Sequence, residues 1–165
     1  MKAICPSNVL NEMDKHQLIY KIDTTWSRLE EAITGLADAR MTQPGVTADW
    51  SVKDILGHVT AWEEEALKHL PHILEGKRPP RYSVLYGGID AFNALKTEEN
   101  RNRSLGEVLA RFQGVHAQLV AYVAAAPDEL ISTETRFRRR IRLDTYSHYP
   151  VHTQAIREWR EAQGI

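Results

Sequence analysis

Hydrophobic residues recur every three or four positions in four long segments of the chain, a spacing that places them on one stripe of an α-helix. The predicted helices cover about residues 14–36, 52–74, 105–123 and 144–163. The pattern is weaker between residues 81 and 103, where we predict a loop followed by a short helix from Asp90 to Asn100. No convincing pair of strands is present, so the fold class is all-α: an antiparallel four-helix bundle with an extra short helix between the second and third helices.

Helix boundaries are signalled by capping residues. Ser51 with Asp54, and Ser104 with Glu107, have the spacing of capping boxes, in which each side chain satisfies a free backbone donor of the first helical turn. Asp144 is expected to cap the last helix, which makes residues 128–143 a linker. Five arginines crowd the end of that linker, and we favour a solvated segment there over a clamp for a substrate carboxylate or phosphate.

Length and composition indicate one domain, because 165 residues can bury a continuous core. Residues 1–12 lack helical periodicity and are predicted to be a flexible extension, with the bundle domain at 13–165. The formal net charge of -1 provides no field for polyanions, so we expect no nucleic acid and no membrane among the partners. A lone cysteine, Cys5, and the lack of a signal peptide or long apolar run favour a cytoplasmic location.

Three histidines are candidates for one metal site. His148 and His152 are four residues apart, so a helix projects both from one face. His58 lies in the apolar stripe of the second helix, where an imidazole without a partner would be costly. Imidazole favours transition metals, with zinc or nickel the first choices. The alternative interpretation needs no metal: His58 is a core histidine bonded to a carbonyl, and His148 and His152 are a chance pair at helical spacing. The spacing alone does not exclude it, because the pair lacks the neighbouring glutamate of a zincin motif.

The segments around these histidines resemble a known family. Residues 49–63 read DWSVKDILGHVTAWE and residues 148–152 read HYPVH, similar to helix motifs of the DinB-like superfamily, which includes mycothiol-dependent and bacillithiol transferase-like bundles. The resemblance implies a four-helix bundle in which His58, His148 and His152 bind a divalent metal. Two features depart from the family pattern: Pro150 lies between two ligands, and Thr153-Gln154-Ala155 follows His152 in place of an arginine-glycine-glutamine continuation.

Three functions follow as expectations. A metal held by three imidazoles lowers the pKa of a bound water or thiol, which suggests a hydrolase or thiol S-transferase acting on an electrophilic small molecule. The resemblance implies a low-molecular-weight thiol as co-substrate. The alternative is a non-catalytic protein that sequesters a metal or a toxic metabolite, as in self-resistance; a third is a structural dimer module. A homodimer is possible through the first helix or the loop at 82–89.

Catalytic residues beyond the metal ligands are not assigned. Glu63, Tyr146 and Tyr149 are close enough to the ligands in sequence to transfer a proton, and are equally at home as packing or surface residues. The remaining histidines are expected at helix surfaces or ends and are given no chemistry: His16, His69, His72 and His116.

Overall fold

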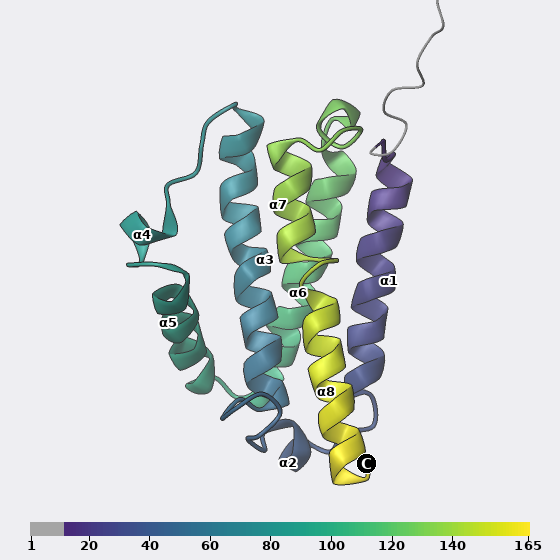
Figure 1. The fold of residues 1–165 in the computed structure, drawn as a ribbon, viewed down its shortest axis with the longest axis vertical. Helices are drawn as coiled ribbons and strands as arrows, with labels where there is room; N and C mark the ends of the chain where they lie inside the picture. The colour runs from purple at the N-terminus through teal and green to yellow at the C-terminus, as the bar shows by residue number, and fades with distance from the viewer. Residues whose placement is uncertain (1–11) are drawn as a thin grey trace, which may run out of the picture.

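The computed structural model describes residues 12–165, so most of the predicted extension at residues 1–12, including Cys5, lies outside the described residues. Three long helices and one broken helix form the bundle (Figure 1): α1 (Lys15–Ile33), α3 (Val52–Leu74), α6 (Leu105–Ala125), and the pair α7 (Arg136–Asp144) and α8 (Tyr149–Gln163), which lie end to end. No strand forms within residues 12–165. The predicted all-α four-helix bundle is confirmed.

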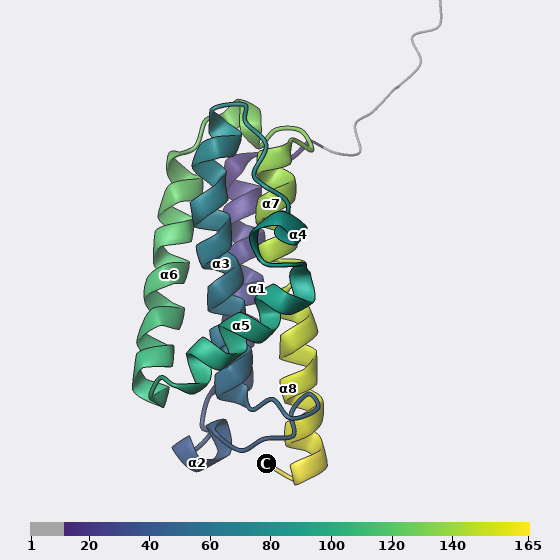
Figure 2. The same ribbon diagram turned by 90° about the vertical axis from the view of Figure 1, so that its left-hand side faces the viewer.

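The connection between α3 and α6 crosses the outside of the bundle. It contains α4 (Tyr82–Leu85) and α5 (Ile89–Arg101), and α5 runs diagonally over α3 (Figure 2). Because α5 returns the chain to the lower end, α3 and α6 run in the same direction, while α1 and the α7–α8 pair run in the opposite one. The predicted short helix at 90–100 is therefore α5, and part of the predicted loop at 82–88 is α4.

Capping and burial account for the long helices. The predicted boxes at Ser51–Asp54 and Ser104–Glu107 are both formed, and α1 has a further box between Asp14 and Gln17. The stripes meet in one core with fully buried side chains on each long helix, including Leu18, Ile22, Ile55, Leu70, Phe112, Leu119, Phe137 and Ile156. Two short elements cover the ends, α2 (Asp38–Met41) and the 3-10 turn η1 (Asp128–Leu130). Among residues 12–165, no helix is both long and apolar enough to span a membrane.

The fourth helix differs from its prediction. Residues 136–144 are not a linker but the helix α7, which is capped by Thr135 and buries Phe137 and Ile141 against the bundle. Asp144 is the buried last residue of α7 and pairs with Arg140, so it is not the cap of the last helix. The chain breaks after it at Thr145, with φ -127° and ψ -104°, and resumes as α8.

The arginines of α7 are not all solvated. Arg138 is buried and lies beside Glu134 and the Ile131 carbonyl, while the side chain of Arg140 is only 14% exposed. The prediction of a solvated linker is therefore wrong for these two residues. Their charges are balanced by acidic residues of the same segment, and the overall composition contains no sign of that pairing.

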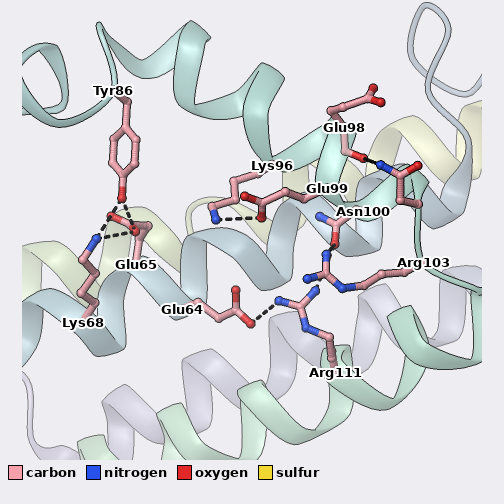
Figure 3. Close-up of polar contacts among 11 residues, drawn as sticks. Glu64, Glu65, Lys68, Tyr86, Lys96, Glu98, Glu99, Asn100, Arg103 and Arg111 are labelled. Atoms are coloured by element: carbon pink, nitrogen blue, oxygen red, sulfur yellow. Dashed lines mark hydrogen bonds and ion pairs between the residues drawn. The ribbon is translucent and has the colours of Figure 1, made fainter.

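Close packing of α5 on α3 depends on Gly57. Asn100 of α5 is buried where a Cβ on Gly57 would project: the ideal Cβ position is 2.6 Å from the Asn100 Cγ and 2.7 Å from its Nδ2. The Asn100 Oδ1 accepts hydrogen bonds from Arg103 at 3.1 Å and Arg111 at 3.0 Å, and Arg111 also pairs with Glu64 (Figure 3). The missing side chain at Gly57 thus lets one asparagine join α3, α5 and α6.

A second set of polar contacts joins the crossover to α3 near its upper half. The Tyr86 hydroxyl donates to Glu65 at 2.8 Å and accepts from Lys68 at 2.9 Å (Figure 3). Tyr82 reaches the same carboxylate, 3.3 Å from its Oε2. These contacts place the two tyrosines of the crossover over the face of α3 that carries Trp62 and His58.

Candidate metal centre

Three ring nitrogens from two helices converge on one point. The Nε2 of His148 lies 3.1 Å from the Nε2 of His58 and 2.9 Å from the Nε2 of His152. One ring nitrogen from each histidine lies within 4.8 Å of those of the other two. Nitrogens bound to one tetrahedral zinc ion at 2.0–2.1 Å are separated by about 3.3 Å. The geometry therefore fits three imidazoles that share one ion, which is the set of residues predicted from the sequence.

The start of α8 explains how Pro150 is compatible with this geometry. Tyr149 is the first residue of the helix and Pro150 the second, so the missing N–H of the proline falls in the turn where no helical partner exists. His148 is the N-cap, yet its backbone has φ -94° and ψ -50°, close to helical values. The four-residue spacing therefore still places His148 and His152 on one face, with ring centroids 4.6 Å apart.

Burial keeps the three imidazoles neutral. It is the main cause that lowers the pKa of His58 to about 2, with the neighbouring rings of His148 and His152 acting in the same direction. Burial and His152 lower the pKa of His148 to about 3, and burial lowers that of His152 to about 4. A neutral imidazole keeps the lone pair that binds a metal. The site thus offers three unprotonated donors at neutral pH.

A cavity of about 420 Å³ adjoins two of these histidines. It lies between α3, α7 and the crossover, and its lining residues are His58, Trp62, Tyr82, Ile89, Asn93, Arg140, Leu143, Asp144 and His148. The volume falls within the range of small-molecule pockets. An ion held by the three histidines would therefore lie at the wall of this cavity, next to aromatic, apolar and polar side chains.

A buried polar network lies behind the histidines, on the core side. Glu63 has no exposed surface and accepts hydrogen bonds from the Tyr149 hydroxyl and, at 2.9 Å, from the His116 ring. Trp26 stacks on His116 with ring centroids 3.6 Å apart. Burial raises the pKa of Glu63, against the opposing effects of His116 and Tyr149. Since neither Glu63 nor Tyr149 lines the cavity, the network supports the first turn of α8 and does not face a bound molecule.

Several other residues lie elsewhere than the sequence suggested. His69 and His116 are buried and not at the helix surface, which contradicts the prediction, whereas His16 and His72 are exposed as expected. Tyr146 is half-buried beside Lys21 and does not line the cavity. The sequence carried one signal for His116, its place three residues before Leu119 on the buried stripe of α6.

Comparison with solved structures shows the same fold at low sequence identity. The colibactin self-resistance protein ClbS is 19% identical, with a TM-score of 0.75 over 88% of this chain and 94% of ClbS. An uncharacterised protein from Escherichia coli UTI89 is 16% identical, with a TM-score of 0.76 over 96% and 99% of the two chains. The sibling lethal factor precursor DfsB is 16% identical, with a TM-score of 0.77 over 92% and 97%. No curated protein matches the chain.

One of these structures corrects the expectation that nucleic acid is excluded. ClbS was crystallised in complex with double-stranded DNA. A bundle of this fold therefore associates with DNA, and the near-zero net charge of the present chain is not a ground for excluding such a partner. The inference from net charge was wrong because nucleic-acid binding depends on the charge of one surface. The net charge of the whole chain does not report how charge is distributed over its surfaces.

The remaining comparison concerns the sequence itself. The model of the DinB superfamily matches residues 21–155, from the first turns of α1 into α8, and so includes all three histidines of the site. The match covers the elements that form the bundle and the motifs around His58 and His148. The chain belongs to the DinB superfamily.

Proposed function

We propose that this protein is a metal-dependent enzyme in which His58, His148 and His152 hold one divalent ion, zinc or nickel, beside a pocket for an electrophilic small molecule. The observation that carries the proposal is the convergence of three neutral Nε2 atoms at the wall of the cavity. When bound, such an ion lowers the pKa of a water or thiol in its open position and so supplies a nucleophile at neutral pH. The reaction is accordingly hydrolysis or transfer of a low-molecular-weight thiol.

The residues around the cavity have defined parts in this proposal. Trp62 and Tyr82, with ring centroids 5.4 Å apart, form an aromatic wall next to His58 and His148. Ile89 and Leu143 are about half exposed and lie at the same cavity, where a bound molecule would cover them. Burial of this apolar surface favours binding of an uncharged body and removes water from the reacting position.

A second candidate is a non-catalytic protein that sequesters a metabolite. It is favoured by one observation: the fold is shared with ClbS, a self-resistance protein. The same pocket would then hold a toxic electrophile without turning it over. The two candidates make different predictions for excess substrate, since an enzyme consumes many equivalents and a sequestering protein saturates at one.

The metal site is tested first, without any assumption about activity. Chelator-treated protein is titrated with zinc and with nickel by calorimetry, and its thermal unfolding is followed. At a free zinc concentration of 100 times Kd, binding adds about 2.7 kcal/mol to the free energy of unfolding, which corresponds to a rise in Tm of about 5–11 °C for a domain of this size. His58→Ala abolishes the rise, whereas the exposed His16→Ala retains it. An equal rise in both variants, or none in the wild type, contradicts the proposed site.

Activity is tested next with p-nitrophenyl acetate, in water alone and with bacillithiol. Release of p-nitrophenol without thiol indicates a hydrolase, and release that requires the thiol indicates a transferase. Both should disappear after chelation and in His58→Ala, and return when zinc is restored to the wild type. Stoichiometric binding of electrophiles without turnover favours sequestration, and turnover that survives chelation contradicts a metal-dependent reaction.

A further inference from the structure

Arg140 is held in the wall of the cavity in a fixed orientation. Its Nε faces the Asp144 carboxylate, and its Nη2 donates to the Tyr82 hydroxyl at 2.8 Å. The guanidinium carbon lies 5.9 Å from the Trp62 ring centroid and 5.8 Å from that of Tyr82, distances typical of cation–π contact. Nη2 is therefore hydrogen-bonded and Nε ion-paired within the protein, so the side chain loses little freedom when a ligand binds.

The third nitrogen, Nη1, remains available. Within residues 12–165 it has no hydrogen-bond partner, and it is not among the polar atoms closed off from solvent. The contacts with Asp144 and Tyr82 hold the pKa of Arg140 above its ordinary value although burial acts in the opposite direction, so the group stays cationic. A charged donor at the wall of an otherwise largely apolar cavity calls for an acceptor on the bound molecule.

A second donor lies on the crossover side. The Asn93 Oδ1 accepts from the Trp62 indole at 3.1 Å, so the amide oxygen is used and the Nδ2 group keeps its two hydrogens. Asn93 and Arg140 both line the cavity, one from α5 and one from α7. Apart from the metal ligands, the cavity therefore offers mainly donors, with Asp144 as the one carboxylate in its lining.

Charge limits what this arrangement accepts. The Asp144 carboxylate already lies against the Nε edge of Arg140, and Glu65, on the far side of Tyr82, pairs with Lys68. In the metal-free protein, a phosphate dianion would bring two negative charges to a guanidinium that Asp144 already opposes. A monoanion matches the single positive charge, and a carboxylate oxygen can accept a charge-assisted hydrogen bond from the Nη1 group, which the described part of the chain leaves without a partner.

We propose that Arg140 binds a carboxylate group of the substrate, so that the substrate class is a small electrophile that carries a carboxylate on an apolar or aromatic body. The body would lie against Trp62 and Tyr82, with the reactive centre toward His58 and His148. The identification as a substrate rests on the proposed function. The binding of a carboxylate at Arg140 does not, because it uses only side chains of this chain.

The test compares benzoate with its uncharged isostere benzamide. Binding to metal-free protein is followed by NMR, using the Trp62 indole N–H that bonds to Asn93. Benzoate should bind about tenfold more tightly than benzamide. Arg140→Gln should lower the affinity for benzoate to that for benzamide. Arg139→Gln, a change at the exposed neighbouring arginine, should leave the preference for benzoate intact.

Arg140→Gln leaves the buried Asp144 without its partner and could unfold the protein for that reason. A second variant therefore controls for this loss of stability. Arg140→Gln with Asp144→Asn removes both charges and keeps hydrogen-bonding groups at both positions; it too should lose the preference for benzoate. Equal binding of benzoate and benzamide to the wild type overturns the proposal, as does a benzoate preference that persists in either folded variant. Failure of the zinc titration with a retained benzoate preference removes the proposed function and leaves the carboxylate site. Zinc binding without a preference for benzoate removes the carboxylate site and leaves the proposed metal site.

Discussion

Replacement of Gly57 by alanine tests whether the crossover is held by close approach of α5 to α3. In an ordinary helix interior the change stabilises by about 0.5–1 kcal/mol, because alanine has the higher helix propensity. At Gly57 the added methyl would lie 2.6–2.9 Å from three atoms of Asn100, shorter than any real contact. Asn100 is 2% exposed and cannot swing into open solvent without leaving its partners.

The expected magnitude combines three effects. Overpacking of a well-filled site costs about 1–3 kcal/mol. Displacement of the Asn100 side chain breaks its bonds with Arg103 and Arg111, each worth about 0.5–1.5 kcal/mol. The gain in helix propensity offsets about 1 kcal/mol. Gly57→Ala should therefore lower the free energy of unfolding by about 1–5 kcal/mol, whereas helix propensity alone predicts that it raises this free energy.

Gly114 provides the matched control. It lies exposed in the middle of α6, and an added Cβ meets no atom within 4 Å, so Gly114→Ala should stabilise by about 0.5–1 kcal/mol. Both variants are measured by urea denaturation monitored by circular dichroism. In an Asn100→Ala background, which removes the two closest contacts, Gly57→Ala should cost less than in the wild type. If Gly57→Ala is as stabilising as Gly114→Ala, the close approach is not a constraint and the reasoning is refuted.

Two further predictions concern the interior behind the site and its protonation. Tyr149→Phe leaves Glu63 with one partner and should cost about 1.5–3 kcal/mol in urea denaturation, against less than about 0.5 kcal/mol for the exposed Tyr20→Phe; equal losses would show that the network is not stabilising. Because the pKa of His58 falls from 6.5 to about 2 on folding, the unfolded chain binds more protons below pH 6.5, and metal-free protein loses stability as the pH falls. Burial raises the pKa of Asp144 to about 7, which affects stability in the opposite direction, so the test compares His58→Ala with the wild type. Below pH 6.5 the free energy of unfolding of the variant should fall less steeply with pH, by about 1.4 kcal/mol per pH unit. Equal slopes in the two proteins would contradict the lowered pKa of His58.

The parts of the fold that local sequence determines could be predicted. The stripe and the capping box of the second long helix identify α3 with its observed bounds, Val52–Leu74. The pairing of His148 with His152 depends only on helical spacing, and it survives because the break ends one residue before His148, whose backbone stays near helical values. The convergence with His58 needed the resemblance to a family, since 90 residues separate His58 from His148.

The remaining features depend on partners distant in sequence. Only Phe137 and Ile141 mark the buried face of α7 among five arginines, so the segment resembles a polar linker until Arg140 is placed against Asp144 and Tyr82. The sequence did not predict the wall of the cavity that the crossover forms, because the residues of that wall are ordered by contacts with α3. Glu63 and His116 are 53 positions apart, and although the buried stripe of α6 includes His116, it does not indicate which polar group pairs with it.

The interruption of the fourth helix lies between Arg140 of α7 and His152 of α8. In an unbroken helix, eight residues would separate Arg140 from His148 by about 12 Å along the axis, a span fixed by the helical pitch. Here α7 packs on α3 and α8 packs on α1, so each half is anchored to a different neighbour. The short segment between them, residues 145–148, is therefore the only link between the two halves of the fourth helix within residues 136–163. A change of length there would alter the size of molecule that reaches from the guanidinium to the imidazoles, while leaving both anchoring surfaces untouched.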